Sequence, residues 1–120
     1  MSVILIAGIG IAAAVWSAEA PAPKAYVIGE MTAKDATGYR AYADAAAPII
    51  QRYGGRFLVR GGQTVAVEGA TPARIVIIEF ASLDAAKKFE TSPEYTAIAP
   101  LRRKAADSRL LLLEGTVTPP

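Results

Sequence analysis

Cysteine and histidine are both absent from this chain of 120 residues. Without cysteine the protein cannot form a disulfide, a thiolate nucleophile or a zinc–sulfur site. Without histidine it lacks the commonest general base and metal ligand, so Ser-His-Asp and Cys-His mechanisms are excluded. A haem held by a histidine ligand is not expected for the same reason. The sequence therefore predicts neither a bound metal nor a cofactor.

A strong excess of charge of either sign is also missing. Thirteen Lys and Arg oppose eleven Asp and Glu, which gives a formal net charge of +2. The two signs alternate along the chain and form no basic stripe, so no nucleic-acid partner is expected. Neither Gly54-Gly55 nor Gly61-Gly62 is followed by a helix, as a phosphate-binding loop would require. The length and the apolar half of the composition indicate one globular domain.

The N-terminal stretch has no charged side chain as far as Ala18. Its apolar run Val3–Trp16 is shorter than the roughly 20 residues of a membrane span and fits the core of a signal peptide. Ala18-Glu19-Ala20 has the small-x-small form of a cleavage site, although a basic residue before the core is missing and Pro21 would follow the cut. We expect export to the periplasm or the medium, with no membrane span in the mature form. An uncleaved membrane anchor and a buried N-terminal element are the alternatives.

Three segments are expected: a leader with a Pro-Ala linker over residues 1–23, a folded domain over residues 24–116, and a tail over residues 117–120. Within the domain, hydrophobic patterning predicts strands at Ala25–Met31, Arg56–Arg60, Arg74–Phe80 and Arg109–Gly115, and further extended chain at Thr64–Glu68. A long helix is expected after the capping residue Asp35, kinked or broken at Pro48 and ended at Gly54. Further helical segments should follow Ser82 and Ser92, the second bent at Pro100.

The order strand, helix, strand, strand, helix, strand is that of a ferredoxin-like α+β subunit with an antiparallel sheet. The segments RIVIIEF and RLLLLEG are apolar on both faces, which indicates that both faces of the sheet are covered. The helices can cover only one face. A second copy of the same sheet is the simplest cover for the other, so a homodimer is predicted.

Several segments resemble, in this order, the family called domain of unknown function 1330: YGGRFLVRGG, VEG, RIVIIEF, SPEY and a last strand that closes with Glu114-Gly115. The likeness covers Ala25–Gly115. It implies a ferredoxin-like subunit that dimerises into an α+β barrel, and it implies no established activity. Proteins of similar fold include cofactor-free monooxygenases, isomerases and dechlorinating enzymes, but a shared fold is weak ground for assigning function.

Strand alternation places several polar side chains on the face that would line the barrel at the dimer interface. The candidate ligand-binding residues on this face are Arg60, Glu79, Arg56, Glu30 and Tyr26. A guanidinium there would hold a small organic anion. A carboxylate acting as base would make the protein a cofactor-independent enzyme. No catalytic residue is assigned.

The alternative is a non-catalytic structural or interaction dimer, in which Arg56–Glu79 and Arg60–Glu30 are ion pairs that close a sealed interior. An open cavity that holds Arg60 and a carboxylate would favour the binding protein over this alternative. Tyr39, Tyr42 and Tyr53 have the spacing of core residues. Arg102-Arg103-Lys104 is interpreted as a solvated helix face, with Arg102 turned toward the pocket as the alternative.

Overall fold

A computed structural model describes residues 22–71 and 74–117. The predicted leader and the end of the tail lie outside the described residues. The elements are β1 (Ala25–Ala33), α2 (Ala36–Arg52), β2 (Arg56–Arg60), β3 (Arg74–Phe80), α3 (Leu83–Glu90), α4 (Pro93–Ala105) and β4 (Ala106–Glu114). This order confirms the ferredoxin-like α+β fold predicted from the sequence. Among the described helices, none is long and apolar enough to cross a membrane.

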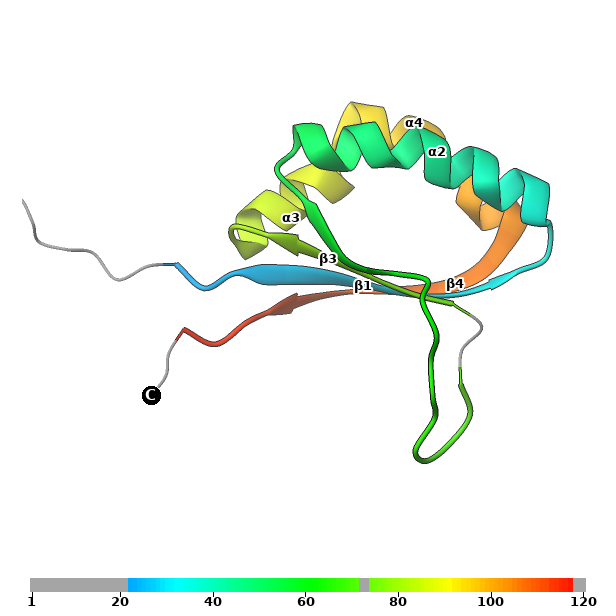
Figure 1. The fold of residues 1–120 in the computed structure, drawn as a ribbon. Coiled ribbons are helices and arrows are strands. Elements are labelled where there is room, and N and C mark those ends of the chain that lie inside the picture. Colours follow the sequence, from blue (N-terminus) through cyan, green and yellow to red (C-terminus); the bar gives the residue numbers. More distant parts are fainter. Residues whose placement is uncertain (1–21, 72–73, 118–120) are drawn as a thin grey trace, which may run out of the picture.

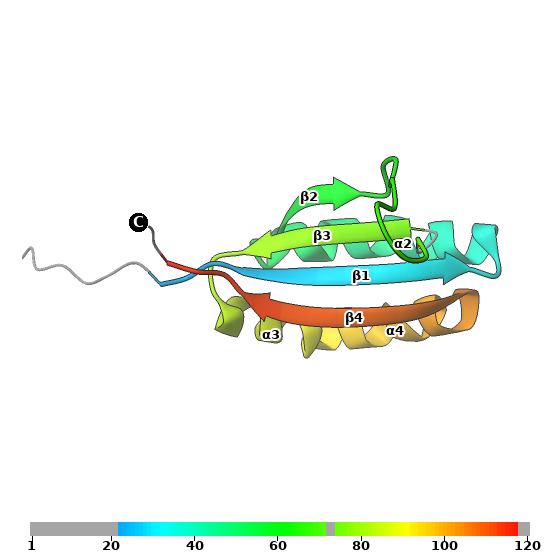
Figure 2. The ribbon, with the colours of Figure 1, turned by 90° about the horizontal axis from the view of Figure 1, so that it is seen from below.

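The four strands form one antiparallel sheet in the order β2-β3-β1-β4. All three helices cover the same face of this sheet, and the opposite face is open (Figure 1). The view from the open side shows the strands lying across the helices behind them (Figure 2). The prediction that the helices leave one face of the sheet uncovered is therefore confirmed for the single chain.

Strand β1 shows how the alternation of side chains divides the two faces. Val27 and Met31 are buried under the helices, whereas Tyr26, Ile28 and Glu30 alternate with them and are only half-buried. Gly29 lies on the helix side, where a Cβ atom would approach the Met31 side chain to 2.7 Å. The absence of a side chain at Gly29 therefore leaves room on this face of the sheet.

The long helix α2 begins where its sequence predicts. The Asp35 carboxylate accepts a hydrogen bond of 3.0 Å from the Gly38 N–H, which is the expected N-cap. At the other end Gly54 adopts a positive φ of 85°, and its N–H donates to the Gln51 carbonyl. The predicted break at Pro48 does not occur, because the helix continues to Arg52. Pro48 is exposed, so water can reach the backbone there.

The second helical region is two helices, as predicted, with Ser82 and Ser92 as their N-caps. Two neighbouring residues of α4 have the opposite exposure from what their side-chain types suggest. Leu101 is 44% exposed, whereas its neighbour Arg102 is only 7% exposed. The interpretation of Arg102 as a solvated helix residue is therefore wrong. Arg102 follows Tyr95 by seven residues, so both lie on the same face of the helix and turn toward α2.

The segment between β2 and β3 does not form the expected extended continuation of the sheet. Residues 61–71 leave the sheet as a loop on the side away from the helices (Figure 1). Val65 and Val67 are exposed in this loop. The glycines Gly61 and Gly69 both have positive φ, which turns the chain out of the sheet plane.

Candidate functional site

A bulge in β2 changes the face on which Arg60 lies. Arg56 is paired with Glu79 and Phe57 with Ile78, but the register then shifts, and Arg60 is paired with Val76. Val76 is buried on the helix side of β3. One extra residue in a strand reverses the alternation of every side chain after it. The prediction that Arg60 shares the open face with Glu79 is therefore wrong.

The other four candidate residues lie on the open face, away from Arg60. Glu79 is paired across the sheet with both Tyr26 and Arg56. The Arg56 guanidinium and the Glu79 carboxylate form an ion pair of 3.0 Å, as the alternative interpretation expected. Lys24 adds a second contact to Glu79 at 3.6 Å.

Glu30 does not pair with Arg60. Its carboxylate accepts a hydrogen bond of 3.0 Å from Arg109, which lies opposite it on β4. The predicted Arg60–Glu30 ion pair is therefore wrong, because the two side chains project from opposite faces of the sheet. The carboxylates on the open face are thus already satisfied by neighbouring cations, and none of them lies with Arg60.

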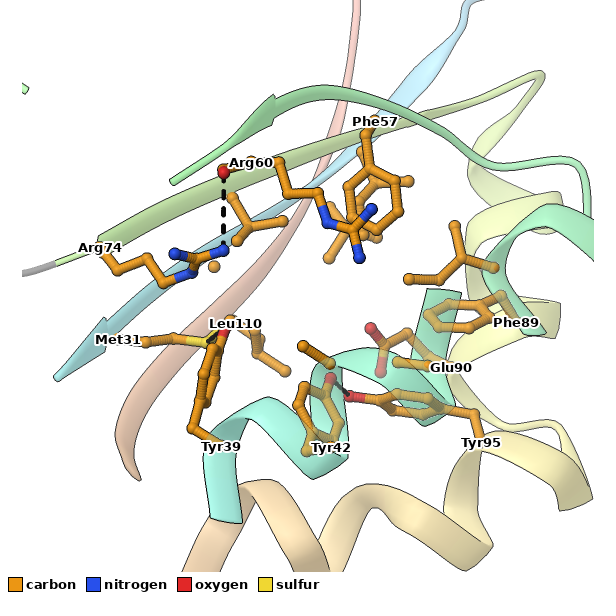
Figure 3. Close-up of a pocket in the computed structure, with 17 residues that line it drawn as sticks. Met31, Tyr39, Tyr42, Phe57, Arg60, Arg74, Phe89, Glu90, Tyr95 and Leu110 are labelled. Atoms are coloured by element: carbon orange, nitrogen blue, oxygen red, sulfur yellow. Dashed lines mark hydrogen bonds between the residues drawn. The ribbon is translucent and has the colours of Figure 1, made fainter. Parts of the chain in front are cut away.

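Arg60 instead contributes to a cavity between the sheet and the helices. The space open to the centre of a water-sized sphere is about 40 Å³. Three charged side chains reach this cavity: Arg60 and Arg74 from the strands, and Glu90 from the last turn of α3 (Figure 3). The walls between them are aromatic and aliphatic. The aromatic lining residues are Tyr39, Tyr42, Phe57, Phe89 and Tyr95.

Arg74 is held at the mouth of the cavity by contacts to three residues. Its guanidinium packs against the Cα of Gly61, where any Cβ atom would overlap it. It lies 5.5 Å from the ring centre of Tyr39 and donates to the backbone carbonyl of Arg60 at 3.5 Å. Its Nε is buried and has no hydrogen-bond partner within the described residues. A buried donor without a protein partner is costly unless water or a ligand reaches it.

Arg60 lies beside Arg74 and is oriented by an aromatic ring. Its guanidinium carbon is 4.3 Å from the ring centre of Phe57, within the range of a cation–π contact. Over the part of the chain that the structure describes, no carboxylate lies within ion-pair distance of Arg60 or Arg74. Two guanidinium groups, one on the exposed Arg60 and one on the half-buried Arg74, therefore reach the cavity without a carboxylate partner among the described residues.

Glu90 lines the same cavity from the end of α3 (Figure 3). Burial raises the pKa of the Glu90 carboxyl above its usual value, and the positive charges of Arg102 and Arg103 on α4 lower it by less. A carboxylate in such a place holds a proton more readily than one in water. Within the described residues no group of acidic side chains could hold a metal ion.

A hydrogen-bonded network forms the floor of the cavity. The hydroxyls of Tyr42 and Tyr95 are 2.7 Å apart, and Arg102 Nε donates to the Tyr95 hydroxyl at 3.4 Å. Arg102 also donates to the Ser108 hydroxyl at 2.6 Å. Burial and the neighbouring Tyr95 raise the pKa of Tyr42 far above its usual value, so Tyr42 stays protonated. The network can therefore offer hydrogen-bond donors, but no base, to the cavity.

Tyr42 belongs to the packed core, as its spacing predicts, but it also lines the cavity. Sequence reasoning missed two charged residues of the cavity, Glu90 and Arg74, and favoured a solvated position for Arg102, although all three occupy core positions in the sequence pattern. Glu90 follows Leu83 by seven residues on α3, so it lies on the apolar side of that helix. Arg74 has the same strand parity as the buried Val76. A charged residue at a position that periodicity assigns to the core could have identified these site residues from the sequence, and Arg102 is a further example.

The fold and this cavity define a ferredoxin-like α+β protein with a small charged site between its sheet and its helices. A family model described as domain of unknown function (DUF1330) matches residues 24–116. The chain therefore belongs to this family, as its motifs predicted. No curated protein matches the chain in sequence.

Solved structures share the fold at low sequence identity. A protein of unknown function from Rhodopseudomonas palustris is 22% identical over 81% of this chain and 85% of its own, with a TM-score of 0.64. SnoaB, a cofactor-independent oxygenase from Streptomyces nogalater, is 16% identical over 82% and 99%, with a TM-score of 0.59. A dimeric ferredoxin-like protein of unknown function from Bacteroides fragilis is 18% identical over 76% and 95%, with a TM-score of 0.52. At these identities the likeness establishes the fold alone.

Proposed function

We propose that the protein binds a small organic anion in the cavity between its sheet and its helices, with Arg60 and Arg74 as the anion-binding residues. The observation that carries this proposal is the pair of guanidinium groups that reach the same cavity without a carboxylate partner among the described residues. A guanidinium matches a carboxylate group with two parallel hydrogen bonds. The sequence placed the expected pocket on the open face at the dimer interface, whereas the cavity that holds Arg60 and Glu90 lies on the helix side of the sheet, so the criterion stated for the barrel does not apply to it.

The walls of the cavity favour an organic anion over an inorganic one. Phe57 and Tyr39 lie beside the two guanidinium groups, and Val76 and Ile78 line the sheet side. Apolar walls gain free energy only from a ligand with apolar atoms. A space of about 40 Å³ for water-sized centres suits a short-chain acid. Small carboxylates are therefore better probes than phosphate or large aromatic acids.

The test is a titration of the full chain with pyruvate and propionate, followed by protein NMR shifts, with phosphate as the inorganic comparison. Arg60→Ala should abolish carboxylate binding, because it removes one of the two cations. Arg56→Ala is the matched control on the same strand, and it should bind as the wild type does, since Arg56 faces the other side. Equal loss in both variants, or no binding by the wild type at millimolar concentration, would contradict the proposal.

A homodimer formed through the open face of the sheet is the second part of the proposal. Leu111 is 38% exposed and Leu113 is 46% exposed on that face, beside the half-buried Ile28 and Ile77. A continuous aliphatic surface of this kind is normally covered in a soluble protein. The similar protein from Bacteroides fragilis is described as dimeric. A structural dimer alone remains the alternative function if the cavity binds no acid.

Export is a further proposal, and it rests on the sequence of residues 1–23. The apolar run, the small-x-small site and the Pro-Ala-Pro linker are the supporting features. Mass spectrometry of the protein from its native host should find a mature N-terminus between Ala18 and Lys24. A full-length product in the cytosol would contradict export, and a full-length product in the membrane fraction would support the anchored form instead.

A further inference from the structure

The position of Glu90 makes the cavity more than a binding site. The carboxyl lies among aromatic and aliphatic lining residues, in the same cavity that Arg60 and Arg74 reach from the strands (Figure 3). Within the described residues no cation forms an ion pair with Glu90. Each of the other carboxylates assigned to a site from the sequence, Glu30 and Glu79, has such a partner. Among the described residues, Glu90 is therefore the carboxylate of this cavity that is placed to act on a bound molecule.

The charged groups around Glu90 come from every element packed near it. Arg102 and Arg103 on α4 act on it through their charges, Tyr95 and Tyr42 line the cavity floor, and the strands supply the two arginines. Burial is the largest influence on this carboxyl. A base whose pKa lies nearer to neutral than that of a solvated glutamate retains an abstracted proton more easily. The arrangement thus places a partly desolvated carboxyl and two guanidinium groups in one small cavity.

We infer that the cavity takes a short-chain 2-oxo acid and that Glu90 removes a proton from the carbon next to its carbonyl group. This inference rests on the proposed anion site. In a 2-oxo acid the carboxylate and the carbonyl oxygen are adjacent, so both can face Arg60 and Arg74. The acidic C–H group then lies at the opposite end of the molecule, toward Glu90. A simple carboxylate lacks an acidic C–H group, and a large acid exceeds the space available.

The step conserves atoms and electrons. The C–H bond breaks, its proton forms an O–H bond with the Glu90 carboxylate, and the electron pair moves to the carbonyl oxygen as an enolate. The guanidinium groups stabilise the negative charge that develops on that oxygen, as pre-positioned cations do in other sites. Return of a proton from Glu90 restores the oxo acid. In heavy water the returned hydron is deuterium, because the Glu90 carboxyl exchanges with solvent between the two steps.

The experiment follows the methyl signal of pyruvate by proton NMR in heavy water in the presence of the full chain. We expect loss of the methyl signal at least tenfold faster than in buffer. Glu90→Gln should abolish this acceleration and still bind pyruvate, since the arginines remain. Glu90→Asp keeps a carboxylate on a shorter side chain, and it should show slower but measurable exchange. Asp44→Asn, at an exposed position of α2, is the control and should exchange as the wild type does.

The outcomes separate the two proposals. Binding of pyruvate without accelerated exchange would overturn the role of Glu90 and leave the anion site standing. Exchange that persists in Glu90→Gln would overturn it as well, because another group would then be the base. A wild type that neither binds nor exchanges pyruvate would overturn both. If Glu90→Gln does not fold, exchange by Glu90→Asp as fast as that of the wild type would show that the position of this carboxylate is irrelevant.

Discussion

The two faces of the sheet differ in whether their charged side chains form ion pairs. On the open face the charged groups are neutralised by neighbours: Arg56 pairs with Glu79, and Glu30 pairs with Arg109. On the helix side two arginines and Glu90 reach a cavity, and none of the three has an ion-pair partner among the described residues. Neutralised pairs between aliphatic side chains suit a surface that packs against another protein surface. Charges without partners in an apolar cavity suit a ligand.

The two faces also differ in how fully their apolar side chains are buried in the single chain. The helix side is a finished core in the single chain, in which the ring of Phe89 is 1% exposed and stacks 5.5 Å from that of Phe80. The open face leaves Leu111 and Leu113 accessible to water. Changes on the helix side should therefore act on the fold of one chain. In the proposed dimer, changes on the open face should act through association, and their effect should depend on protein concentration.

The largest effect is expected from Ile77→Asp on the open face. Each protomer of a dimer would bury one uncompensated charge at roughly 3–5 kcal/mol, so the penalty is about 6–10 kcal/mol for the pair. Light scattering at micromolar concentration should show a dimer for the wild type, and a monomer or unfolded chain for the variant. Leu101→Asp places the same charge on the exposed side of α4 and should stay dimeric. A compact, stable wild-type monomer would remove the basis of this comparison.

Phe89→Ala should give the next largest effect, on the helix side. Removing a fully buried aromatic ring costs about 3–5 kcal/mol, through lost burial and the cavity left behind. Urea unfolding should show this loss as a lower midpoint. The loss should be the same at every protein concentration, in contrast to that of Ile77→Asp. A loss that disappears at high concentration would show that the helix-side core also depends on association.

Arg60→Lys tests whether the charge or the shape of the side chain matters in the cavity. Lysine keeps the positive charge but loses the planar two-point contact. Pyruvate should bind at least tenfold more weakly, about 1.4 kcal/mol, while the dimer remains intact. Arg56→Lys makes the same change on the open face and should leave the affinity unaltered. If Arg60→Lys instead dissociates the dimer, Arg60 has a structural role and the site assignment is wrong.

Gly61→Ala tests how Arg74 is held. The φ of Gly61 is 74°, and a Cβ atom there would overlap the Arg74 guanidinium. The variant should lose about 1 kcal/mol of stability from the backbone conformation alone. It should also bind pyruvate more weakly, because Arg74 is displaced. Gly62→Ala is the matched control, since nothing lies within 4 Å of its added Cβ atom, and it should change neither property.

The smallest effect is a dependence of stability on pH that comes from Glu90. Burial raises the pKa of this carboxyl in the folded chain, so the folded state holds its proton at a pH where the unfolded state has released it. Stability should therefore fall as the pH rises from the unfolded pKa through the higher folded value. Glu90→Gln should lack this contribution. Urea unfolding of both proteins at pH 4 and pH 7 measures the difference. If the wild type gains stability relative to the variant between pH 4 and pH 7, the predicted direction is wrong.

The sequence by itself determined the order of the elements, the caps at Asp35, Ser82 and Ser92, and the division of the sheet into a covered and an open face. Each of these depends on local patterns: side-chain alternation, helical spacing and short capping contacts. The pairing of Arg56 with Glu79 followed from the same alternation. The sequence also contained the family motifs, and the match to residues 24–116 confirms the family.

Only the tertiary structure decided which charged side chains line the same cavity. Strand parity assumes an unbroken ladder, but the register between β2 and β3 is set by pairing, and its bulge moved Arg60 to the helix side. Glu90 is 30 residues along the chain from Arg60, on a different element, so no local pattern relates the two. The two residues line the same cavity because of how α3 packs on the sheet and because Gly29 leaves space there. A cavity is a property of packing between elements, and packing distances are not contained in the periodicity of any one element.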